Sequence, residues 1–182
     1  GISSNNITQD DLILVSRDIG AHGATIFTAR EGMDMHSNLK SDCNSLYPQV
    51  KALIDAGVKI TALRDATRGG VSAVLNEWAK QSNICIEVEE ENIPVSDEVK
   101  GICEMLGFEA TNLANEGTFV LAIKKEDVAK AIEILHKFSE ASNACIIGKV
   151  TQQYPQKVIL NSSWGTKRFL DTPSGELLPR IC

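Results

Sequence analysis

The chain has 182 residues, enough for one domain with its own core, and its 43% hydrophobic and 23% charged residues are typical of a soluble globular protein. Its 18 basic and 24 acidic residues give a net charge of −6, which argues against non-specific binding to nucleic acid or to a membrane surface. The sequence has no apolar run near the roughly 20 residues of a membrane span, and its five cysteines form no Cys-x-x-Cys pair, which suits reduced thiols in a cytoplasmic protein.

Strand and helix patterns alternate along the chain. Apolar runs and period-two alternation predict strands over residues 11–16, 59–63, 84–89, 119–123, 144–150, 158–160 and 168–170. Apolar positions at helical spacing predict helices over residues 24–31, 46–54, 71–78, 96–106 and 126–138. Ser96 is expected to cap the fourth helix, and Gly107 to end it. The pattern predicts an α/β or α+β domain with helices packed on a sheet over residues 1–170, and it leaves the strand order open.

The last segment, residues 171–182, is predicted to be a flexible tail that ends in a thiol. Pro173, Gly175 and Pro179 disfavour helix and strand interiors, and the chain ends in Pro-Arg-Ile-Cys. An extended arm of this length spans about 36 Å, so the thiol of Cys182 would be able to visit more than one site. The alternative is a frayed terminus that happens to end in cysteine.

Three loops combine glycine with polar side chains and are candidate sites. The first, Gly-Ala-His-Gly at residues 20–23, lies between a predicted strand and a predicted helix. Backbone N–H groups at a helix start bind anions, Gly23 leaves room for a ligand, and His22 can donate to that ligand or act as an acid or base. The alternative is a tight turn with a solvated histidine.

The second loop, Asp-Ala-Thr-Arg-Gly-Gly at residues 65–70, also joins a strand to a helix. Arg68 offers a planar fork for phosphate or carboxylate, and Gly69 and Gly70 permit close approach of a ligand. Asp65 is suited to orient the guanidinium or to bind a cation. The alternative is an ordinary helix start that is capped by the acidic or the hydroxyl residue of the loop.

The third loop, Ala-Asn-Glu-Gly at residues 114–117, precedes a predicted strand. Glu116 lies at the edge of an apolar segment, where a carboxylate suits general base catalysis, and Asn115 is beside it. The alternative is an ordinary turn, since turns favour Asn and Gly. Ser-Asp-Cys at residues 41–43 is a weaker candidate, because a single lysine is the only basic residue near the Cys43 thiol in the sequence.

Taken in order, these motifs resemble one family. The order is Gly-x-His-Gly, Ser-Asp-Cys, Asp-x-Thr-Arg-Gly-Gly, Ala-Asn-Glu-Gly, Ile-Ile-Gly at residues 146–148, and the terminal Pro-Arg-Ile-Cys. Over nearly the whole chain this resembles the C-terminal half of the HypE family of hydrogenase maturation factors. Asp-x-Thr-Arg-Gly-Gly is shared with the wider superfamily of aminoimidazole ribonucleotide synthetase and selenophosphate synthetase. The resemblance implies a synthetase-like C-terminal domain with a mixed sheet.

The resemblance also implies an ATP-dependent carbamoyl dehydratase. In this family the terminal cysteine thiol receives a carbamoyl group from a HypF carbamoyltransferase, and ATP phosphorylates the thiocarbamate oxygen. Loss of phosphate leaves a thiocyanate, whose cyanide passes to iron held by the HypC–HypD complex on the way to nickel–iron hydrogenase. The expected site residues are Cys182, Glu116 and Asn115 for catalysis, and His22, Gly23, Asp65, Arg68, Gly69 and Gly70 for ATP.

Two departures limit what the resemblance implies. The first loop more often reads Gly-Asp-His-Gly in the family, and Ala21 stands here in place of the aspartate, so no role for that carboxylate carries over. The family's N-terminal half, which supplies most of the nucleotide and Mg²⁺ site and the dimer contacts, is missing from this sequence. We therefore expect the chain alone to be inactive and the intact protein to be a cytoplasmic homodimer, with no protein metal ligands in this half.

Two other functions stay open. One is a different ATP-dependent synthetase of the same superfamily, which would need no terminal cysteine. The other is a non-catalytic docking module for an iron-delivering partner, which would bind that partner without any tail-dependent ATP hydrolysis.

Overall fold

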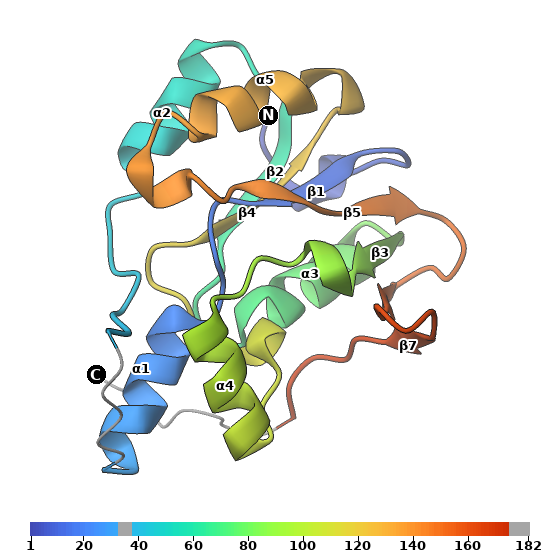
Figure 1. Cartoon of the computed structure of the whole chain (residues 1–182). Coiled ribbons are helices and arrows are strands. Elements are labelled where there is room, and N and C mark those ends of the chain that lie inside the picture. Colours follow the sequence, from blue (N-terminus) through green and yellow to red (C-terminus); the bar gives the residue numbers. More distant parts are fainter. Residues whose placement is uncertain (33–37, 175–182) are drawn as a thin grey trace.

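The computed structural model describes residues 1–32 and 38–174, and within them seven strands form one sheet in the order β2-β4-β1-β5-β3-β6-β7 (Figure 1). The strands are β1 (Leu12–Val15), β2 (Ile60–Asp65), β3 (Cys85–Glu89), β4 (Phe119–Ile123), β5 (Cys145–Thr151), β6 (Lys157–Asn161) and β7 (Lys167–Phe169). Of the described strand pairs, β3–β6 is parallel and the others are antiparallel. The predicted α+β fold with a mixed sheet is confirmed.

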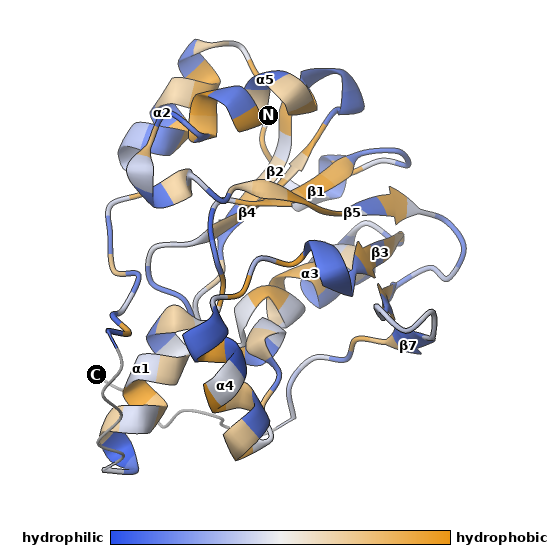
Figure 2. Cartoon of the chain, in the orientation of Figure 1, coloured by the Kyte–Doolittle hydropathy of each residue, from blue (hydrophilic) through white to orange (hydrophobic). Residues whose placement is uncertain are grey.

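Helices cover both faces of this sheet. They are α1 (Ala21–Arg30), α2 (Tyr47–Asp55), α3 (Gly70–Gln81), α4 (Asp97–Leu106) and α5 (Val128–Leu135). In Figure 1, α2 and α5 lie above the sheet, and α1, α3 and α4 lie below it. Apolar residues concentrate on the strands and alternate with polar ones along the helices (Figure 2), so each helix turns an apolar side inward. None of the helices in the described ranges is long and apolar enough to cross a membrane.

Three apolar clusters hold these layers together. The largest joins α3 to the sheet: Val74, Leu75 and Trp78, which share one side of α3, pack with Ile86 and Val88 of β3. The second joins α2 and α5 to the opposite face of β1, β2 and β4. The third joins α1 to α4 away from the sheet, and it brings the start of α1 beside the loop that precedes β4. The helical spacing read from the sequence thus identified the buried side of α3.

Most predicted boundaries hold within a few residues, and two differences affect the candidate site. The helix predicted from residue 24 begins at Ala21, because Gly20 adopts the left-handed region (φ 87°) that starts the helix directly after the turn. His22 and Gly23 therefore belong to the first turn of α1 and not to a loop. The helix predicted over 126–138 is also shorter, since α5 is flanked by short 3₁₀ turns.

The α4 boundaries agree with the prediction. The Ser96 hydroxyl accepts a hydrogen bond from the Val99 N–H at 3.3 Å, and Gly107 adopts a left-handed conformation (φ 72°) after the last turn. Leu170 is 2% exposed and its carbonyl accepts a hydrogen bond from Asn76 Nδ2 at 2.8 Å, so the chain is anchored there after β7.

Candidate functional site

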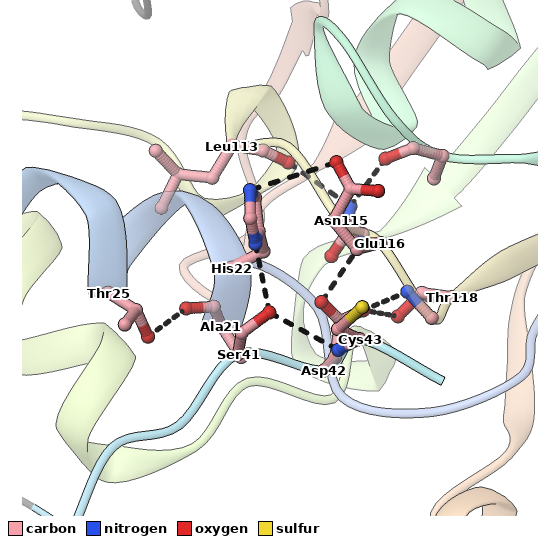
Figure 3. A network of polar contacts seen from close by, with 12 residues as sticks. Ala21, His22, Thr25, Ser41, Asp42, Cys43, Leu113, Asn115, Glu116 and Thr118 are labelled. Carbon is pink, nitrogen blue, oxygen red and sulfur yellow. Dashed lines mark hydrogen bonds and ion pairs between the residues drawn. The ribbon is translucent and has the colours of Figure 1, made fainter. Parts of the chain in front are cut away.

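A single buried amide ties the three candidate loops together (Figure 3). Asn115 is 1% exposed, and its Oδ1 accepts a hydrogen bond from the Gly20 N–H at 2.8 Å. Its Nδ2 donates to the Ala66 carbonyl at 2.8 Å and to the Leu113 carbonyl at 3.1 Å. The amide thereby joins the start of α1, the segment after β2 and its own loop. Both ends of this side-chain amide are thus bonded to the backbone of the loops, and Asn115 holds the loops in place.

His22 points from the first turn of α1 toward the third loop. Its side chain is 19% exposed, and Nε2 lies 3.7 Å from Oε1 of Glu116. Its other ring nitrogen, Nδ1, lies 2.9 Å from the hydroxyl of Ser41. The histidine is therefore held between two polar partners and is not the solvated residue of a tight turn.

Glu116 lies at the surface of this arrangement. Its side chain is 44% exposed, so the carboxylate is open to solvent. Its backbone, in contrast, is held firmly: the Glu116 N–H donates to Asp42 Oδ1 at 3.0 Å. The backbone of Glu116 is thus fixed, while its carboxylate lies close to His22 and is accessible to a reactant.

The segment 41–43 belongs to the site, although the sequence marked it as a weaker candidate. Asp42 is 2% exposed, and its Oδ2 accepts hydrogen bonds from the Gly117 N–H at 2.9 Å and the Thr118 hydroxyl at 2.6 Å. Sequence reasoning considered only the thiol of Cys43, which is exposed. It missed Asp42, because a polar loop carries no signal of which distant loop it will contact.

The second loop lies on the other side of Asn115. Asp65 ends β2, and both Asp65 and Arg68 are exposed. In the described part of the chain neither forms an ion pair, so Asp65 does not orient the guanidinium here. Gly69 and Gly70 start the twelve-residue helix α3, both with left-handed backbones (φ 76° and 62°).

This helix start suits a phosphate group. The start of a helix carries a partial positive charge, and the exposed Arg68 adds a full one, whereas the Gly70 N–H already donates to the Thr67 carbonyl at 3.0 Å. Residues 1–32 and 38–174 contain no group of three or more His, Cys, Asp or Glu side chains that would hold a metal ion. Cys182 lies outside the described residues.

Comparison with known proteins identifies similar chains. Residues 8–161 match the family model described as AIR synthase related protein, C-terminal domain. The chain is 43% identical to carbamoyl dehydratase HypE of Escherichia coli over 98% of its own length, and 42% identical to a putative hydrogenase expression/formation protein of Methanocaldococcus jannaschii over 97%. It spans about half of these relatives, 52% of each.

Solved structures agree with the sequence matches. A crystal structure of E. coli HypE superposes over the whole chain and 55% of its own length with a TM-score of 0.93 and 41% identity. A HypE structure in complex with ATP matches over the whole chain and 55% of its own length with a TM-score of 0.94 and 33% identity. A chain of a HypE–HypF complex matches over 95% of this chain and 56% of its own length with a TM-score of 0.90 and 36% identity. The resemblance read from the motifs is therefore confirmed.

Proposed function

The chain belongs to the family of AIR synthase related proteins through their C-terminal domain, and on this premise we propose that it is part of a carbamoyl dehydratase acting in hydrogenase maturation. One observation carries the proposal most directly. The accessible Glu116 carboxylate and the His22 ring face each other at 3.7 Å, in a chain that is 43% identical to a carbamoyl dehydratase.

The proposed reaction removes one oxygen and two protons from a carbamoyl group. The thiolate of Cys182, in a tail that we assign to residues 171–182, accepts the group as a thiocarbamate. Its oxygen leaves as phosphate, its nitrogen loses both protons, and a thiocyanate remains on the sulfur. Glu116 is the base for the nitrogen, and His22 stabilises its carboxylate.

ATP would supply the phosphoryl group that converts the carbamoyl oxygen into a leaving group. We assign its phosphates to the start of α3, with Arg68, Gly69 and Gly70, and we assign Gly23 and Asp65 to the same nucleotide site. A similar HypE structure is a complex with ATP, which supports ATP as the phosphoryl donor. We assign the Mg²⁺ site and the remaining nucleotide contacts to the half of the relatives that this chain does not cover.

The proposed partners follow the order of the reaction. A HypF-like carbamoyltransferase would load the thiol, and a similar HypE chain has been crystallised with HypF. The HypC–HypD complex would accept the cyanide, and the intact protein would be a homodimer in the cytoplasm. The 182-residue chain by itself is expected to catalyse no turnover, since it holds only part of the nucleotide site.

Mass spectrometry of the full-length protein tests this function. After incubation with a carbamoyl donor, the carbamoyltransferase and ATP, we expect the mass of a carbamoyl group and then of a cyano group on the peptide that contains Cys182. Cys182→Ala is expected to gain neither, whereas Cys43→Ala, which removes an exposed thiol, should gain both. Modification of the Cys182→Ala protein would refute the proposal.

A second pair of variants tests the base. Glu116→Gln is expected to accumulate the carbamoyl form and to lose dehydration by about a hundredfold or more, the range for removal of a general base. The matched control Glu104→Gln, on an exposed position of α4, should react normally. Normal dehydration by Glu116→Gln would remove Glu116 from its role.

The same assays distinguish the two alternative functions. ATP hydrolysis that persists when residues 171–182 are deleted would favour another synthetase. Binding of a partner protein without ATP hydrolysis would favour a docking module.

A further inference from the structure

The geometry points to Ser41 and Asp42 as positioning residues that hold the Glu116 base, and the His22 ring that faces it, in one orientation. Both lie in the Ser-Asp-Cys segment, to which the proposed reaction assigns no role. The effect of this positioning on catalysis rests on the proposed function, whereas the orientation of the two side chains is a property of the fold. The contacts of Ser41 and of Asp42 support the inference separately (Figure 3).

Asp42 fixes the backbone from which the Glu116 side chain extends. One carboxylate oxygen accepts the Glu116 N–H at 3.0 Å, and the other accepts the Gly117 N–H at 2.9 Å and the Thr118 hydroxyl at 2.6 Å. Asp42 is 2% exposed, and no basic side chain pairs with it within the described ranges. A buried carboxylate needs such donors, so its three partners are drawn into one arrangement.

The contact is so close that it excludes a side chain at Gly117. A Cβ atom there would lie 1.8 Å from the Asp42 carbonyl oxygen. The two segments are therefore packed backbone against backbone, 75 residues apart in sequence. This close backbone packing fixes the position from which the Glu116 side chain extends.

Ser41 acts on the histidine. Its hydroxyl lies 2.9 Å from His22 Nδ1 and accepts the Cys43 N–H at 3.2 Å. On the far side of the ring, Nε2 faces the Glu116 carboxylate at 3.7 Å. A neutral imidazole carries one N–H, and a bare Nε2 lone pair would be repelled by the carboxylate oxygen.

The neutral ring should therefore carry its proton on Nε2, facing Glu116, and accept a hydrogen bond at Nδ1 from the Ser41 hydroxyl. When the ring is protonated, the same hydroxyl rotates and accepts from Nδ1–H instead. Ser41 thus supports both states of the ring with one orientation. In both states of the ring the Nε2–H then faces Glu116, so it holds the carboxylate in one orientation as the base without rotation of the imidazole.

Nitrogen NMR of the full-length protein with ¹⁵N-labelled histidine tests the orientation directly. The chain has three histidines, and the His22 signals are identified by their loss in His22→Asn. For the neutral ring, we expect one tautomer with the proton on Nε2. In Ser41→Ala the two nitrogen shifts should move toward the average of exchanging tautomers, and Ser41→Thr should restore them. A proton on Nδ1 in the unmodified protein, or unchanged shifts in Ser41→Ala, would overturn the role of Ser41.

Kinetics test the consequence for the reaction. Ser41→Ala and Asp42→Asn are expected to lower the rate of dehydration about tenfold to a hundredfold, with the level of carbamoylation and the KM for ATP unchanged, because only proton transfer is misaligned. Asp42→Asn keeps the acceptor for Glu116 but turns an NH₂ group toward two donors. Ser45→Ala and Asp55→Asn, at exposed positions, are the matched controls.

The two measurements separate this inference from the proposed function. If the unmodified protein shows no dehydratase activity, the proposed function fails and the NMR result still decides the orientation. If the unmodified protein is active, the Asp42→Asn variant decides the role of Asp42. Should this variant have a normal melting temperature and dehydrate at the normal rate, Asp42 has no positioning role. A raised KM for ATP with normal dehydration would equally contradict it.

Discussion

At the scale of single residues, Asn115 shows how a motif residue is used by the fold. The sequence assigned it to catalysis beside Glu116, and the structure places it 1% exposed with hydrogen bonds to three loop segments. It is the residue through which the start of α1 and the segment after β2 keep a common geometry. Its removal should therefore act on stability first and on activity through stability.

We predict that Asn115→Ala lowers the free energy of unfolding by about 2 kcal/mol or more, because the buried Gly20 N–H loses its acceptor. Urea unfolding followed by circular dichroism measures the loss. The side chain of Asn44 is exposed and accepts a hydrogen bond from the adjacent Ser45 N–H, so Asn44→Ala should change stability by less than about 0.5 kcal/mol. An Asn115→Ala protein as stable as the control would contradict the role of Asn115 as a clamp.

At the scale of elements, the start of α3 depends on two glycines for different reasons. Gly70 combines a left-handed backbone (φ 62°) with close packing, since a Cβ there would lie 2.5 Å from the Leu113 carbonyl oxygen. Gly57, after α2, has a similar backbone (φ 71°) but open space around it. Substitution of Gly57 therefore measures backbone strain alone, and substitution of Gly70 measures backbone strain plus the collision with the loop before β4.

Gly57→Ala should cost about 1 kcal/mol, the strain of a left-handed alanine. Gly70→Ala should cost on the order of 3 kcal/mol or more, because the helix start must also move away from the loop before β4. Chemical denaturation of the two variants gives both values. Equal losses would show that the packing of α3 on that loop adds nothing to stability.

At the scale of the whole molecule, the partly buried thiols link stability to pH. Burial raises the pKa of Cys103 above its ordinary value of 9.0. Burial also raises the pKa of Cys145, and the negative charge of Asp18 adds to the effect. Above pH 9 the unfolded chain therefore releases thiol protons more readily than the folded chain. The stability from these thiols is complete below that pH and is lost as the pH rises through their raised pKa values.

We accordingly expect the urea midpoint to fall between about pH 8 and pH 10, and to fall less steeply in a Cys103→Ala, Cys145→Ala double variant. The measured quantity is the slope of the urea midpoint against pH. Other groups also titrate in this range, but their contributions cancel when the double variant is compared with the unmodified chain. Cys43→Ala, which removes an exposed thiol, serves as the control. A double variant with the slope of the unmodified chain would show that these thiols do not contribute.

The sequence by itself determined the elements, the buried side of α3 and the α+β class, because apolar periodicity and capping residues act over a few neighbouring positions. It also identified the three loops, through their glycines and polar side chains. It misplaced the start of α1, since the left-handed turn at Gly20 let the helix begin inside the motif.

Only the tertiary structure decided which of these loops meet. Hydrogen bonds that assemble the site join segments far apart in sequence, 74 residues from Asp42 to Glu116 and 95 residues from Gly20 to Asn115. Such contacts depend on the strand order, which local patterns do not encode. For the same reason the exposure of Glu116 and the buried carboxylate of Asp42 became visible only when β1, β2 and β4 lay side by side.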